Sequence, residues 1–298
     1  MKQYLVLYLK GLAMGIADLV PGVSGGTVAL ISGIYYQLVK LLAQINLAFF
    51  GKLLTLKFAA LQKEYEIVFF IVLGAGILSG IAGGAGLVHY ALENYSPVVY
   101  ALFGGLIIVA ATNLITTNLI TKSSINNINV CGRFGTSFGG GILFALVLIF
   151  WLNINLPWTP LAIFAAGGLA ICAMLLPGIS GSLILLLLGL YEPILNALVN
   201  LDFYHLSFFI AGALTTLFGF SKLIMFSLKK YNKQTMGFMS GLMLGVLPKL
   251  WPWQDGETSL VLMSPAAYSS HGNSAYLVAC LVALAVGLAI IPLVKYKR

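Results

Sequence analysis

Residues 17–35 read ADLVPGVSGGTVALISGIY, and residues 173–191 read AMLLPGISGSLILLLLGLY. Both stretches interrupt a long apolar run with the same Pro-Gly-x-Ser-Gly turn, and a Gly-x-Tyr follows each turn after a short apolar segment. Proline lacks a backbone N–H and disfavours helix just before it, whereas glycine adopts conformations that other residues resist. We therefore expect these stretches to form the broken tips of two similar helical hairpins.

The composition indicates a membrane protein. The chain is 60% hydrophobic and only 8% charged, with a mean hydropathy of +1.00, whereas a soluble domain carries about a quarter charged residues. A bilayer-spanning helix needs roughly 20 apolar residues, and suitable runs lie at 67–90, 97–115, 139–156, 206–228, 236–251 and 275–294. These runs predict an all-α polytopic membrane protein with about six full transmembrane helices, built as a single transmembrane domain over residues 1–298.

The positive charge is concentrated between the apolar runs and orients the chain. Loops at 93–97 and 252–273 contain no lysine or arginine, in contrast to the clusters formed by Lys40, Lys52, Lys57, Lys63, Lys229, Lys230 and Lys233. The positive-inside rule places such clusters in the cytoplasm. We therefore predict a multi-pass protein of the cytoplasmic (inner) membrane with both its N-terminus and its C-terminus cytoplasmic. In this arrangement hairpins 3–39 and 159–200 are re-entrant and enter from opposite sides.

The two hairpins belong to a longer internal repeat. The residues Pro21, Gly22, Ser24, Gly25, Gly33 and Tyr35 recur as Pro177, Gly178, Ser180, Gly181, Gly189 and Tyr191. The segments 86–95 and 222–231 also align, although the charge pattern places their ends on opposite sides of the membrane. We predict inverted repeats at 1–125 and 135–253, followed by an additional C-terminal transmembrane helix at 275–294. Inverted repeats with broken helices are typical of secondary transporters whose site lies near the bilayer midplane.

Each broken tip offers a site for an anion. The first N–H groups of a helix lack intrahelical partners, and the helix dipole makes this end positive. We therefore expect phosphate, or a phosphate headgroup, to bind both tips together with one lysine. The predicted phosphate-binding residues are Ser24, Gly25, Gly26, Thr27, Ser180, Gly181, Ser182 and Lys222. Serine and threonine are also natural N-caps, so tight turns closed by their own side chains are the alternative.

Ionisable residues at membrane depth are functional candidates by default. Lys222 is predicted to be a counter-ion for the substrate, or else to extend its amine to the cytoplasmic interface. Asp18 has two open roles, as a cap for the first hairpin or as a proton carrier. Glu192 follows Tyr191 on the returning arm of the second hairpin and is a candidate for proton coupling or for a charge partner of the substrate.

The paired motifs also support a family resemblance. The stretches GIADLVPGVSGGTVALISGIY, LPGISGSLILLLLGLYE and GLMLGVLPKLWPW resemble a bacterial and archaeal polyprenyl-phosphate (undecaprenyl-phosphate) translocase family, and the resemblance spans most of the chain. It implies a transporter that returns undecaprenyl phosphate, or a related polyprenyl phosphate, from the outer to the inner leaflet. Its role would be lipid-carrier recycling in cell-envelope synthesis, with coupling to the proton motive force.

The sequence departs from that family pattern at two positions. Tyr36 follows the first Gly-x-Tyr, where the family often has glutamate. The family usually has a basic residue at the same place in both halves of the repeat, whereas this chain has Lys222 in the second half and Gly86 in the first. The resemblance therefore implies an asymmetric site with one cationic partner.

A secondary transporter of a small soluble anion remains an alternative. A lipid phosphatase would need a nucleophile with an activating base, yet the histidines are scattered and both arginines are peripheral. We therefore expect no enzymatic activity, cofactor, metal or nucleic-acid partner. Membrane lipid is the expected surrounding partner, and the sequence is compatible with a homo-oligomer.

Overall fold

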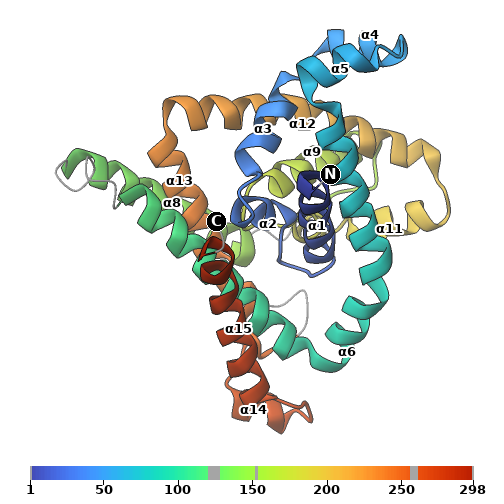
Figure 1. The fold of residues 1–298 in the computed structure, drawn as a ribbon. Helices are drawn as coiled ribbons and strands as arrows, with labels where there is room; N and C mark the ends of the chain where they lie inside the picture. Colours follow the sequence, from blue (N-terminus) through green and yellow to red (C-terminus); the bar gives the residue numbers. More distant parts are fainter. Residues whose placement is uncertain (1, 120–127, 152–153, 256–260, 297–298) are drawn as a thin grey trace. The chain divides into compact units, whose positions relative to one another are not determined.

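A computed structural model describes residues 2–119, 128–151, 154–255 and 261–296. These residues are overwhelmingly helical, in agreement with an all-α membrane protein (Figure 1). The described helices are α1 (Lys2–Asp18), α2 (Gly25–Ile31), α3 (Tyr35–Gln44), α4 (Leu47–Leu54), α5 (Phe58–Tyr65), α6 (Ile67–Leu119), α8 (Ile128–Trp151), α9 (Pro160–Leu175), α10 (Gly181–Leu187), α11 (Tyr191–Val199), α12 (Phe203–Lys230), α13 (Asn232–Gly245), the 3-10 helix η1 (Leu247–Leu250), α14 (Pro265–Ser270) and α15 (Leu277–Tyr296). Two short strands, β1 (Gln254–Asp255) and β2 (Val261–Leu262), pair antiparallel.

The number of spans differs from the predicted six. Within the described ranges, three helices are long and apolar enough to cross a membrane, or up to five if each bent helix pair is one span. The runs predicted at 67–90 and 97–115 are joined in α6, whose helical backbone is broken at Tyr95. The run at 236–251 divides into the 14-residue α13 and the short η1. Apolar composition therefore located these helices, but it did not predict that the run at 236–251 is divided.

The two predicted hairpins have the same local backbone. Helices α1 and α9 end just before the Pro-Gly pairs, and α2 and α10 begin just after them. Gly22 and Gly178 have φ values of 85° and 99°, and Gly33 and Gly189 have φ values of 78° and 68°. These left-handed conformations favour glycine because it has no Cβ. At the second pair of glycines the helices bend sharply, by 116° between α2 and α3 and by 112° between α10 and α11.

Contacts divide the chain into two compact units. Unit 1 comprises Met1–Ala85, Asn155–Leu176 and Ser180–Lys230, and unit 2 comprises Gly86–Ile154, Pro177–Ile179 and Tyr231–Arg298. The segments of the two units alternate along the chain, so the units do not correspond to the predicted repeats. The repeats at 1–125 and 135–253 therefore remain a prediction from the sequence.

Close helix packing builds unit 1. Helix α12 lies along α9 and also packs against α3 (Figure 1). A methyl group added to Gly212 of α12 would lie 1.9 Å from the Phe164 carbonyl oxygen, and one added to Gly167 of α9 would lie 2.2 Å from that of Phe209. Glycine lets helix backbones approach closely in a membrane, where small residues dominate helix interfaces. This contact therefore holds α9, the first arm of the second hairpin, against α12.

Unit 2 uses the same kind of contact between α8 and α13. Methyl groups added to Gly141 and Gly241 would lie 2.2 Å and 2.1 Å from carbonyl oxygens of the facing helix. A small core also forms where Trp253 packs with Ala101 and Cys280. The Trp253 indole N–H donates to the Ala275 carbonyl at 2.8 Å, which satisfies its polar group.

Candidate functional site

The first hairpin tip is closed by its own side chains. The Asp18 carboxylate accepts a hydrogen bond from the Gly25 N–H at 2.6 Å. The Ser24 hydroxyl, at the N-cap of α2, accepts one from the Gly26 N–H at 3.1 Å. Ser24 and Thr27 are buried, with 1% and 2% exposure. Of the two roles open to Asp18, the structure therefore shows the capping role, and the first N–H groups of α2 already have acceptors.

The second tip lacks an equivalent cap. Ser180 occupies the N-cap of α10, but among the described residues its side chain makes no capping bond to that helix. Its hydroxyl instead lies 2.7 Å from the Ser182 hydroxyl. The predicted residues of this tip, Ser180, Gly181 and Ser182, thus combine two adjacent hydroxyls with a helix start that no described side chain caps.

Residues of both tips approach one another around Met174. A methyl group added to Gly26 would lie 2.7 Å from the Met174 carbonyl oxygen, and one added to Gly181 would lie 2.8 Å from Met174 Cγ. The Tyr35 hydroxyl donates to the Leu175 carbonyl at 2.8 Å, which ties the first hairpin to the end of α9. Sequence reasoning used Tyr35 only as a repeat marker and did not identify this contact.

Lys222 lies in a different place from the tip residues. It lines a shallow cavity of about 340 Å³ together with Lys40, Lys229 and residues of the same two helices, α3 and α12. The tip serines are not among the residues that line this cavity. We expected Lys222 to line one site with the tip residues, and this cavity does not bring them together.

Glu192 lies in the first turn of α11 and is exposed. A carboxylate in the first helical turn interacts favourably with the positive helix end. The position of Glu192 at the start of α11 is therefore favourable by itself and requires no contact with the hairpin tips.

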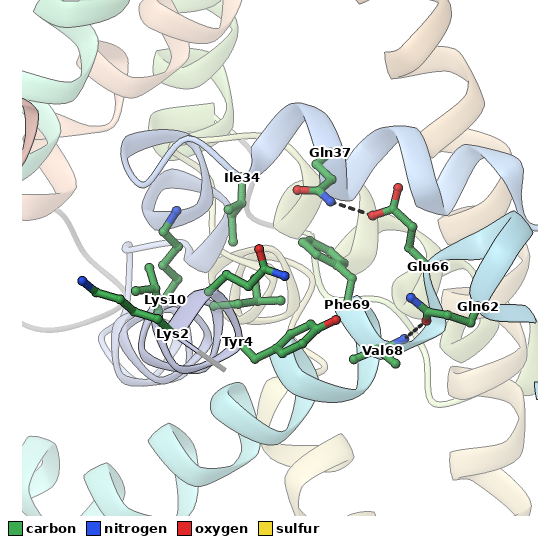
Figure 2. Close-up of a pocket in the computed structure, with 12 residues that line it drawn as sticks. Lys2, Tyr4, Lys10, Ile34, Gln37, Gln62, Glu66, Val68 and Phe69 are labelled. Carbon is green, nitrogen blue, oxygen red and sulfur yellow. Dashed lines mark hydrogen bonds between the residues drawn. The ribbon is translucent and has the colours of Figure 1, made fainter. Parts of the chain in front are cut away.

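Sequence reasoning did not single out Lys10, which lies in the middle of the apolar α1. Its amine donates to the Ser32 carbonyl at 2.7 Å, at the break between α2 and α3. Lys10 also lines a cavity of about 880 Å³, together with Tyr4, Gln37 and Glu66 (Figure 2). The amide of Gln37 donates to Glu66 at 2.8 Å in the lining of this cavity. A lysine inside an apolar helix was the signal available in the sequence.

Lys249 is a second lysine that the sequence analysis passed over. It lies in η1 with 9% exposure, and its carbonyl accepts a hydrogen bond from the Gln254 amide at 3.0 Å. Its position inside the apolar run 236–251 was again the available signal, because a lysine is rarely buried unless it is paired.

Comparisons with known proteins identify relatives over most of the chain. The family model of undecaprenyl phosphate translocase-like proteins matches residues 14–267. A polyprenyl-phosphate transporter of Vibrio cholerae is 37% identical over 253 residues, which cover 85% of this chain and 79% of that protein. A polyprenyl-phosphate transporter of Staphylococcus aureus is 33% identical over 265 residues, which cover 82% and 85% respectively. No solved structure gives a significant match.

Proposed function

Since the chain belongs to the undecaprenyl phosphate translocase-like family, we propose that it moves a polyprenyl phosphate between the two leaflets of a membrane. Undecaprenyl phosphate is the substrate that the family description favours. We further propose the cytoplasmic membrane as its location, with both chain ends cytoplasmic, because the lysine clusters follow the positive-inside rule. Transport from the outer to the inner leaflet would then return the lipid carrier for reuse.

The observation that carries a phosphate site is the uncapped start of α10 beside Ser180 and Ser182. A phosphate oxygen placed there would accept from backbone N–H groups and from hydroxyls, in a region where water is scarce. Unsatisfied donors are costly in such surroundings, so an anion with several oxygens stabilises the tip. The prenyl chain would remain in the surrounding lipid while the headgroup occupies the tip.

The first tip plays a different part in this proposal. Phosphate reaches the Gly25 N–H group only when the Asp18 carboxylate moves away. It reaches the Gly26 N–H group, beside Thr27, only when the Ser24 hydroxyl also turns away. Protonation of Asp18 weakens its bond to Gly25, since a neutral acid is a poorer acceptor than a carboxylate. Asp18 would thereby couple proton uptake to the opening of the first tip, and Glu192 is the second candidate for such coupling.

The test is leaflet exchange of a fluorescent polyprenyl phosphate in liposomes that contain the purified protein. We expect protein-dependent exchange that is slowed in a Ser180→Ala, Ser182→Ala double variant. Ser207→Ala is the matched control, because within the described ranges this exposed hydroxyl bonds only the Tyr204 carbonyl of its own helix. Exchange at the protein-free rate would refute lipid transport. Uptake of inorganic phosphate without lipid exchange would identify a carrier of soluble anions instead.

A further inference from the structure

Three lysines converge on one cavity between α3 and α12. On α12, Lys222 and Lys229 lie seven residues apart, and Met225 and Phe226 fall between them on the same face. On α3, Lys40 and Gln44 lie one turn apart on the face that lines the cavity. Because α3 packs against α12, the lysines of both helices border a single space.

This cavity carries positive charge without a compensating acid. Its lining contains no aspartate or glutamate, and none of its three lysines takes part in an ion pair found among the described residues. Like charges held around one small space repel one another. A bound anion would relieve it.

The geometry suits an anion with several oxygens. Seven residues along α12 correspond to about 10 Å, and each lysine amine is carried on a flexible four-carbon stem. A phosphate monoester carries about −1.5 to −2 charge at neutral pH and accepts hydrogen bonds on three oxygens. Two or three lysines therefore match its charge, and the Gln44 amide offers a further donor.

The cavity also has an apolar side. Met225 and Phe226 line it, and Phe226 is 54% exposed. The cavity volume of about 340 Å³ falls at the lower end of small-ligand sites. A phosphate headgroup with the start of a hydrocarbon chain fits this combination better than a bare ion does.

We propose that Lys40, Lys222 and Lys229 form a phosphomonoester-binding site, separate from the hairpin tips, at which a lipid phosphate docks on its way to or from the tips. The docking role rests on the proposed function, whereas phosphate binding by the three lysines does not. Inorganic phosphate and a prenyl phosphate share the headgroup chemistry, so the experiment compares them.

The experiment measures binding of farnesyl phosphate and of inorganic phosphate to the full chain in phosphatidylcholine nanodiscs. We expect Lys222→Gln to weaken farnesyl phosphate binding about tenfold, as the loss of one charge-assisted contact predicts, and Lys40→Gln with Lys229→Gln to weaken it further. Lys222→Arg keeps the charge and should retain most of the affinity. Lys63→Gln is the matched control, because this lysine lies on α5 and outside the cavity.

The outcomes separate this site from the proposed function. Unchanged farnesyl phosphate affinity in all glutamine variants, with native thermal stability, would overturn the lysine site while leaving lipid transport intact. Lysine-dependent binding without leaflet exchange in liposomes would support the site and refute the transport proposal. Equal lysine dependence for inorganic phosphate would support the site and show that the headgroup alone is recognised. Sensitivity only to added phosphatidylglycerol would overturn the proposal in favour of general attraction to an anionic leaflet.

Discussion

Replacing Tyr35 by phenylalanine removes one hydroxyl from a buried contact between the two hairpins. Tyr35 is 2% exposed, and its hydroxyl donates to the Leu175 carbonyl at 2.8 Å. Leu175 is the last residue of α9, so its carbonyl lacks the usual partner further along the helix. The substitution deletes the bond and leaves a buried acceptor unpaired, which costs about 1–3 kcal/mol.

The assay is the free energy of unfolding of the purified protein in mixed micelles. Tyr36→Phe is the first control, because Tyr36 follows on the same helix and is 48% exposed. Tyr191→Phe is the second, because Tyr191 holds the corresponding place in the second hairpin and is 39% exposed. Both controls should stay within about 0.5 kcal/mol of the parent protein. If Tyr35→Phe is no less stable than these controls, the hydroxyl does not join the hairpins.

Three further changes test other contacts. Asp18→Ala should destabilise the protein by about 0.5–2 kcal/mol through loss of the α2 cap, and Asp18→Asn by less, as unfolding in mixed micelles would show. Gly212→Ala should destabilise the protein because its methyl would lie 1.9 Å from a carbonyl oxygen of α9, whereas Gly219→Ala, with open space around it, should be neutral or stabilising by up to about 1 kcal/mol in the same assay. The His205 ring and backbone N–H lower the pKa of Asp202 by hydrogen bonding, so this stabilisation is present above the ordinary aspartate pKa and is lost as pH falls through the lowered one. The difference in melting temperature between the parent protein and Asp202→Asn should therefore shrink towards acid pH.

The hairpins could be predicted from the sequence because local chemistry determines them. The Pro-Gly pairs end α1 and α9, and the glycines at the tips adopt positive φ values in the structure. The serines that follow occupy the N-caps of α2 and α10, as the cap preference predicts. Each of these features depends on residues within a few positions of one another.

The surroundings of Lys222 could not be predicted in this way. The spacing of Lys222 and Lys229 places both on one face of α12, but Lys40 comes from α3 and joins them only through helix packing. The role of Asp18 was open for a similar reason, since its carboxylate reaches Gly25 only once the turn between them has its folded path. Long-range packing determines where Lys40 lies, and the path of the intervening turn determines which donor Asp18 reaches.

The difference between the two tips can be reduced to one aligned pair of positions. A methyl group added to Gly25 would lie 2.6 Å from an Asp18 carboxylate oxygen, and one added to Gly181 would lie 2.8 Å from Met174 Cγ. Met174 thus stands at the second tip where Asp18 stands at the first, and it offers no carboxylate to cap α10. We predict that Met174→Asp supplies the missing cap and closes the proposed phosphate site.

The Met174→Asp variant should bind farnesyl phosphate at least about tenfold more weakly, because a fixed carboxylate competes for the same N–H groups and repels the substrate. Met174→Asp should also be at least as resistant to unfolding as Met174→Asn, because asparagine has nearly the same shape as aspartate but carries no charge. Met174→Leu controls for the loss of the thioether alone. Native stability together with unweakened binding would exclude the start of α10 as the phosphate site, whereas weakened binding in Met174→Asp but not in the other two variants would locate the anion there.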